Sequence, residues 1–156
     1  MNLLLAALDE AYDRKSWHGT NLRGSLRGMT AGEAVLRPGP GRHNIWEIAL
    51  HCAYWKYVVW RKITGEKRGT FPLKGSNFWV REEADERTWA LELDLLRTVH
   101  VSLRRAVENL AEADWGKRPP GSKYTYEFFI RGAAAHDLYH AGQIQLIKRM
   151  VGGRFS

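Results

Sequence analysis

The sequence has few of the features that place a protein outside the cell or in a membrane. Among 156 residues there is one cysteine, Cys52, which excludes an internal disulfide and fits a reducing compartment. No apolar run approaches the roughly 18 to 20 residues of a membrane-spanning helix. The N-terminal apolar stretch is short and acidic residues follow it, so no signal peptide is expected. We therefore expect a cytoplasmic protein without a membrane span, and we expect Cys52 to be a buried, unreactive thiol.

Acidic residues are also scarce relative to basic ones, and the formal net charge is +7. Such an excess can attract nucleic acid or an anionic surface. The basic residues are nevertheless dispersed, and the densest group is small: Arg61, Lys62, Lys67 and Arg68. There is no helix-turn-helix spacing, zinc knuckle or basic-aromatic stripe. Nucleic acid is thus disfavoured as a partner, and a solvated basic surface is the simpler interpretation.

No segment alternates between apolar and polar residues over a useful length, so strands are not predicted. Apolar residues at helical spacing predict four long helices instead, separated by loops rich in glycine and proline. The expected helical ranges are 2–17, 44–65, 87–114 and 125–152, with a short helix near 30–36. The segment 66–86 is a long connection between the second and third long helices. The sequence therefore predicts one all-α domain over 1–156, a four-helix bundle with a long crossover between helices 2 and 3.

Two histidines, His136 and His140, lie four residues apart in the last helix, within "AAAHDLYHAGQIQLIKRM". Positions four apart share one face of a helix, so both imidazoles point the same way. The same stripe is otherwise apolar except for Gln143, and it should face the core. Burying an unpaired polar group costs about 1 to 3 kcal/mol, so each ring needs a partner. That partner is either a hydrogen-bonding group or a shared metal ion.

A third ligand is expected from another helix, because two imidazoles alone hold a metal weakly. His51 is the best geometric choice, since it lies in the middle of the second helix on an inward-facing stripe. His100 lies beside the apolar stripe of the third helix, and His18 and His43 lie in or near loops. Cys52 projects about 100° away from His51, so the two do not readily serve one ion. Buried, hydrogen-bonded histidines remain the alternative at this point.

Three nearby polar residues have competing interpretations. Asp137 stands where a zinc protease places its glutamate, but it points about 100° away from the ligand face, so a surface position is favoured over a role in orienting the ligands. Gln143 is a candidate to orient a ligand through a hydrogen bond. Glu47 lies three residues after Asn44, the spacing of a helix-capping box, and capping is favoured over metal binding.

The quoted helix, "GRHNIWEIALHCAYWKY" upstream of it and "AYDRKSWHG" near the start together resemble the DinB-like superfamily. The resemblance extends over nearly the whole chain. It implies a four-helix bundle, often dimeric, in which three histidines bind a divalent metal, and it carries the ligand role to His51, His136 and His140. A three-histidine set leaves a coordination position open, as in catalytic sites. We expect zinc or nickel first, with iron or manganese as alternatives.

Some relatives in this superfamily are thiol-dependent transferases or isomerases, so the resemblance implies a metal-dependent enzyme, such as a thiol S-transferase or a hydrolase. Its partners would be a small-molecule substrate or a low-molecular-weight thiol, and the protein would form a homodimer. The expected cavity beside the metal is lined by Trp17, Tyr54, Trp55 and Tyr139. A non-catalytic, stress-related metal-binding protein is the second hypothesis, because fold and metal site alone do not define a reaction.

Overall fold

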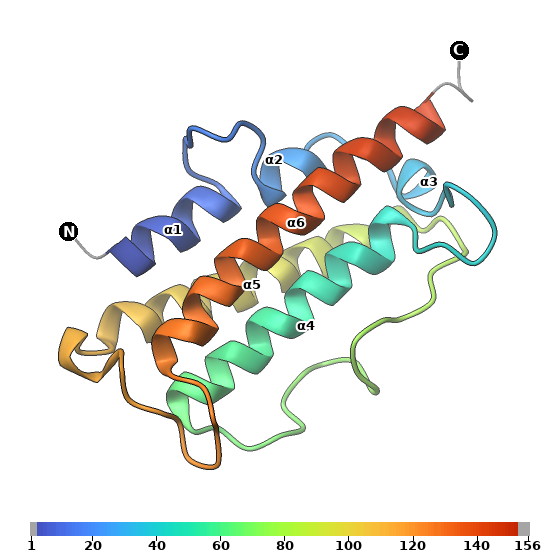
Figure 1. Cartoon of the computed structure of the whole chain (residues 1–156). Helices are drawn as coiled ribbons and strands as arrows, with labels where there is room; N and C mark the ends of the chain where they lie inside the picture. Colours follow the sequence, from blue (N-terminus) through green and yellow to red (C-terminus); the bar gives the residue numbers. More distant parts are fainter. Residues whose placement is uncertain (1–2, 153–156) are drawn as a thin grey trace.

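The structure, a computed structural model, describes residues 3–152 and is all-helical within that range (Figure 1). Four helices form the bundle: α1 (Leu3–Tyr12), α4 (Ile45–Thr64), α5 (Glu86–Asn109) and α6 (Tyr126–Gly152). Helix α4 packs against α5 and α6, and α1 packs against the same two helices. Three short elements complete the fold: α2 (Leu22–Leu26), α3 (Ala31–Ala34) and the 3-10 turn η1 (Glu112–Asp114). The predicted all-α class is confirmed.

The ends of α4 follow from local chemistry. Asn44 precedes the helix in an extended conformation, and its side chain accepts a hydrogen bond from the Glu47 N–H. Gly65 follows with φ 78°, a left-handed conformation that favours glycine, and its N–H bonds to the Arg61 carbonyl. The capping box expected at the short helix near residue 30 is present as well, between Thr30 and Glu33.

Two predicted helices are shorter than expected. Helix α1 ends at Tyr12 instead of near Trp17, because the N–H groups of Asp13 and Arg14 both bond to the Asp9 carbonyl and the chain turns away. Its predicted start at Asn2 lies outside the described residues. Helix α5 ends at Asn109 instead of continuing to 114, and η1 forms the last part of that segment separately.

The connection 65–85 is the long crossover that the sequence predicts at 66–86, and it runs alongside α4 (Figure 1). The C-terminal part of this connection is held to the start of α4, because the side-chain nitrogen of Asn44 donates a hydrogen bond to the Arg81 carbonyl at 2.6 Å. Phe71 and Trp79 pack against the core from this segment. Within residues 3–152, none of the helices is long and apolar enough to cross a membrane.

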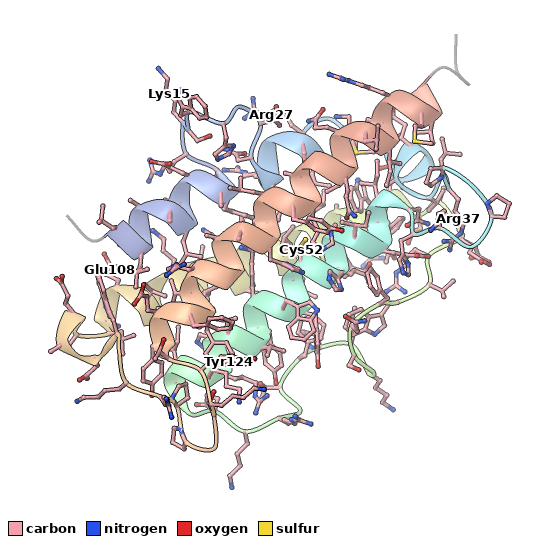
Figure 2. The ribbon with its side chains drawn as sticks, viewed as in Figure 1. Lys15, Arg27, Arg37, Cys52, Glu108 and Tyr124 are labelled. Atoms are coloured by element: carbon pink, nitrogen blue, oxygen red, sulfur yellow. The ribbon has the colours of Figure 1, made fainter. Side chains whose placement is uncertain are left out.

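The apolar core is divided into two clusters along the bundle axis. One cluster includes Trp46 and Leu50 of α4, and the other includes Val59 further along the same helix. Between these positions Lys56 is buried, and it contacts polar groups from α5 and α6 at the same level. Cys52 is also fully buried, as expected, and Figure 2 shows it in the interior of the bundle. The candidate functional residues lie in this polar layer.

Candidate metal centre

The three histidines predicted as ligands come together between α4 and α6. His51 lies near the middle of α4, and His136 and His140 lie one turn apart on α6, which packs against α4. The Nε2 atom of His136 lies 3.0 Å from Nε2 of His51 and 3.1 Å from Nε2 of His140. His51 and His140 are buried and His136 is half-buried. The group is therefore close enough to hold one metal ion.

The spacing of the three nitrogens fits imidazole ligands around one ion. With metal–nitrogen distances of about 2.0 to 2.1 Å, two ligands of a tetrahedral site lie about 3.3 to 3.4 Å apart, and two ligands at a right angle lie about 2.9 Å apart. The observed 3.0 and 3.1 Å fall between these limits. All three ligand nitrogens lie within 4.8 Å of one another.

The other ring nitrogens show which way two of the imidazoles direct their lone pairs. Nδ1 of His51 lies 2.9 Å from the Asn77 carbonyl oxygen, which can only accept, so this Nδ1 carries the proton. Nδ1 of His140 likewise donates to Oε1 of Gln143 at 2.7 Å. In the neutral rings, Nε2 of both residues then presents a lone pair toward His136. Since Nε2 of His136 can donate at most one hydrogen, the three nitrogens cannot satisfy one another, whereas a cation satisfies all of them.

The protonation states support the same conclusion. Burial lowers the pKa of His136 to about 3, helped by the neighbouring histidines, and it lowers the pKa of His140 to about 4. Burial also lowers the pKa of His51. All three rings are consequently neutral near pH 7, which is the form that binds metal.

A model of the DinB superfamily matches residues 14–144. The chain belongs to the DinB superfamily. A crystal structure of a conserved protein from Enterococcus faecalis has a TM-score of 0.66 with this chain at 17% sequence identity. The similarity covers 97% of this chain and 96% of that one, and it shows that the two share a fold. No curated protein matches the chain.

In this DinB-superfamily protein, the crossover supplies contacts to the histidines that the sequence analysis missed. Asn77 provides the carbonyl that orients His51, and Phe78 stacks on the His51 ring at 4.1 Å. His43 stacks on Phe78 at 3.7 Å, so three rings form a column leading out from the site. A loop residue has no helical periodicity to reveal its direction, although the aromatic content of this segment was a signal that it packs against the bundle.

Of the four residues predicted to line a cavity beside the metal, two line cavities that border the histidines. Tyr139 lines a cavity of about 590 Å³ that also borders His140, as expected. Trp55 lines a smaller cavity of about 150 Å³ that borders His136. Tyr54 packs against Phe71 and Trp79 instead, and it lines neither of these two cavities. Trp17 is 100% exposed in the turn after α1, so its predicted place in the cavity is wrong.

The favoured surface position for Asp137 is also wrong. Asp137 is fully buried, and one carboxylate oxygen forms an ion pair with the buried Lys56, which also donates to Nδ1 of His100 at 3.2 Å. Tyr12 stacks on the His100 ring at 3.7 Å and closes the cluster. Helix α6 packs against α1 and α2 as well as α4, so its buried face is wider than the histidine stripe. Lys56 could have been placed in the core from its spacing, four residues after Cys52 and three before Val59.

Glu47 does not close the capping box that its spacing predicts. Its buried carboxylate pairs with Arg37, lies 2.7 Å from Nδ1 of His43 and accepts from the Arg81 N–H at 3.2 Å. Burial alone would raise the pKa of Glu47, but these donors hold it below its ordinary value. Glu47 thus anchors the loops around the start of α4, and it is not part of the histidine group.

A second set of possible ligand atoms, from Cys52, His136 and Asp137, also lies within 4.8 Å of one another. Its chemistry suits a cation poorly. Burial raises the pKa of the Cys52 thiol, which keeps it protonated, and Asp137 is already paired with Lys56. The three histidines are therefore the better metal centre of the two.

Proposed function

We propose that this DinB-superfamily protein binds a divalent cation through His51, His136 and His140, and that the centre is catalytic. The observation that supports this most strongly is the meeting of three neutral imidazole nitrogens, two of them with lone pairs fixed toward the third. Zinc or nickel are the ions we favour for such a set, with iron or manganese as alternatives. When it is bound with an open position, such an ion lowers the pKa of a bound water or thiol.

The residues around the centre have separable roles in this proposal. Gln143 and the Asn77 carbonyl hold two ligand rings in one tautomer and orientation. The cavity beside His140 is lined mainly by apolar side chains, among them Ile48, Leu146 and Met150, and it suits an apolar portion of a substrate. The chain's own thiol, Cys52, is buried and protonated, so a thiol nucleophile would come from a small molecule. The proposed reaction is thus transfer to a thiol or to water.

Metal content tests the site. The protein is purified without a histidine tag and its metal is measured by mass spectrometry; we expect about one divalent ion per chain. His136→Ala should lose most of this metal, while His18→Ala, which removes an exposed histidine outside the group, should retain it. Circular dichroism of both variants establishes that they are folded. Unchanged metal content in folded His136→Ala would refute the assignment.

Activity tests the reaction. The metal-loaded protein and the same protein treated with a chelator are assayed for conjugation of several thiols with a chlorinated electrophile, and for hydrolysis of simple esters. The proposal predicts a rate that depends on the metal for at least one pair of substrates. If none of the rates depends on the metal although the ion is bound, the alternative of a non-catalytic metal-binding protein is favoured.

A further inference from the structure

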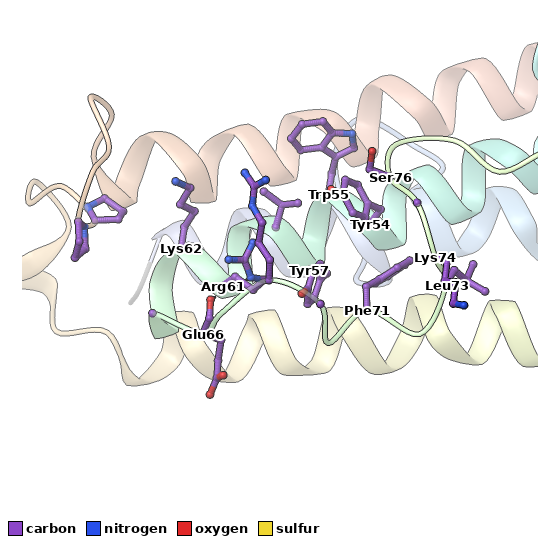
Figure 3. A pocket seen from close by; sticks show the side chains of 17 residues that line it. Tyr54, Trp55, Tyr57, Arg61, Lys62, Glu66, Phe71, Leu73, Lys74 and Ser76 are labelled. Atoms are coloured by element: carbon purple, nitrogen blue, oxygen red, sulfur yellow. Dashed lines mark hydrogen bonds between the residues drawn. The ribbon is translucent and has the colours of Figure 1, made fainter.

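A third cavity, larger than the two beside the histidines, lies further along α4, where the crossover folds back over the C-terminal half of the helix. Its volume is about 790 Å³, which is within the range of roughly 300 to 1,000 Å³ of small-molecule sites. Figure 3 shows side chains of α4, such as Arg61 and Tyr57, and of the crossover, such as Phe71 and Lys74, around it. The α5–α6 connection contributes Pro119 and Pro120 at its edge.

The lining of this cavity is strongly basic. Four basic residues line it (Arg61, Lys62, Arg68 and Lys74) with one acidic residue, Glu66, which gives a formal charge of 4 − 1 = +3. The whole chain carries +7, so nearly half of its excess positive charge gathers at one concave site. The sequence suggests only a solvated basic surface here, whereas the fold places these side chains around a pocket. A concave basic site concentrates field lines and attracts small anions.

One of the guanidinium groups is held in place before any ligand arrives. Nε of Arg61 donates to the carbonyl oxygens of Glu66 at 3.1 Å and Lys67 at 2.9 Å. The guanidinium carbon lies 5.6 Å from the centre of the Tyr57 ring, whose hydroxyl accepts from the N–H and hydroxyl of Thr70. Those two carbonyl bonds use only Nε, which leaves the two terminal nitrogens for a phosphate or carboxylate.

The pocket also offers aromatic surface. Phe71 lies 5.2 Å from Tyr57 and 5.5 Å from Tyr54, measured between ring centroids, and all three line the cavity. Trp55 lines it at the end away from Lys62 (Figure 3), and its ring centroid is 6.5 Å from that of His136. Rings of this kind stack on the planar groups of ligands.

We propose that this pocket binds a small phosphorylated molecule that carries a planar ring, as a mononucleotide does. The basic side chains would hold the phosphate and the aromatic side chains would contact the ring. A single concave site suits a small molecule better than a nucleic acid strand, which requires an extended basic track. The proposal does not depend on the metal, so metal content is no test of it, and either proposal can fail alone.

The test uses adenosine monophosphate as the probe, measured by titration calorimetry at low salt. We expect saturable binding, with adenosine and inorganic phosphate each binding about tenfold more weakly, because each lacks one half of the recognised chemistry. The variant Arg68→Glu/Lys74→Glu changes two exposed side chains of the crossover and should weaken binding about tenfold or more. The matched control, Lys15→Glu/Arg105→Glu, makes the same change in net charge at exposed positions outside the pocket and should leave the affinity within about twofold.

Three results would overturn the proposal. The first is no saturable binding of adenosine monophosphate to the wild-type protein. The second is an equal loss of affinity in the pocket variant and the control, which would indicate general charge attraction. The third is much tighter binding of a single strand of about ten nucleotides through the same residues, which would point to nucleic acid as the ligand.

Discussion

Two polar groups lie side by side in the bundle, where His136 and Asp137 are neighbours on α6, and the two groups differ in how their charges and protons are balanced. In the first, which we call the ion-pair cluster (Tyr12, Lys56, His100, Asp137), the charges of Lys56 and Asp137 neutralise each other. In the second, the histidine group (His51, His136, His140), neutral nitrogens face one another without enough protons to pair them. Burial of polar groups alone therefore does not mark a binding site. What distinguishes the histidine group is three ligand nitrogens that lie close together and lack the protons to pair with one another. Oδ1 of Asp137 also lacks a hydrogen-bond partner, but that carboxylate already has a counter-charge in Lys56.

Of the two groups, the ion-pair cluster should have the larger effect on the free energy of unfolding. Lys56→Met leaves the Asp137 carboxylate buried without its partner, and removing one member of a buried pair costs about 3 to 5 kcal/mol. The double variant Lys56→Met/Asp137→Leu removes both charges and should recover most of that loss. Urea unfolding of the metal-free protein measures both. As a control, Arg97→Met breaks an exposed pair with Asp94 and should cost at most about 1 kcal/mol.

If the double variant were as unstable as Lys56→Met, the ion pair would stabilise the fold by more than is needed to compensate for burying its own two charges. The contrast with the histidine group would then need revision, since both groups would depend on specific polar contacts. Equal metal affinity of the folded double variant and the wild-type protein would further separate the two groups, because it would show that the cluster acts in folding alone.

The histidine group should respond most clearly in metal affinity. Gln143→Leu removes the acceptor that orients His140, and losing such an outer hydrogen bond costs about 10- to 100-fold in metal affinity. Gln143→Glu keeps an acceptor at this place and should retain most of the affinity. Competition with a metal-binding dye measures both. Urea unfolding of the metal-free proteins should show a loss of at most about 1 to 3 kcal/mol for Gln143→Leu, because Nδ1–H of His140 loses its acceptor, and little change for Gln143→Glu. A loss of stability without a loss of metal affinity would contradict this role.

Acid should also act on the histidine group, because its buried rings have a depressed pKa. Burial lowers the pKa of His100 in the ion-pair cluster to about 2, so its contribution has the same sign, and a variant of a single ring is needed to isolate the histidine group. The unfolded chain binds protons at its histidines near pH 6.5, whereas burial holds the pKa of folded His136 at about 3. The part of the unfolding free energy that depends on this ring is therefore fully present above pH 6.5. It is lost progressively as the pH falls, because protonation favours the unfolded chain. Each such histidine contributes a slope of up to about 1.4 kcal/mol per pH unit.

The measurement compares metal-free wild-type protein with His136→Gln between about pH 6.5 and 5. We expect the variant to lose about 1 to 2 kcal/mol less than the wild type over this interval, because one such ring is missing. Burial raises the pKa of Asp137 to about 6, which acts in the opposite direction, but this contribution is common to both proteins. Equal slopes would show that His136 is protonated in the folded protein.

The sequence predicts which three histidines come together because helical periodicity governs their directions. His136 and His140 share one helix, so a spacing of four residues fixes their common direction. His51 follows from the inward stripe of its own helix. The same reasoning fails for Asp137, because the width of the buried face of α6 depends on how many helices pack around it. Periodicity gives the direction of a side chain within its helix, but the depth of burial is set by tertiary packing.

The contacts of crossover residues could not be predicted from helical periodicity, for a different reason. Asn77 contacts His51 through its backbone carbonyl, which any residue type possesses, so its identity carries no signal of that contact. Its identity does carry a signal about conformation. Asn77 has φ 72°, in the left-handed region that asparagine and glycine tolerate better than other residues.

The smallest effect is therefore expected at Asn77. Asn77→Ala should cost about 1 to 2 kcal/mol because the left-handed conformation is unfavourable with a Cβ and without the asparagine side chain. Asn77→Gly relieves this strain. Both variants lose the hydrogen bond from Nε1 of Trp55 to Oδ1, so their difference isolates the backbone. If the conformation positions the carbonyl, Asn77→Ala should also bind metal several-fold more weakly than Asn77→Gly in the dye assay, whereas equal affinities would show that the crossover orients His51 without help from residue 77.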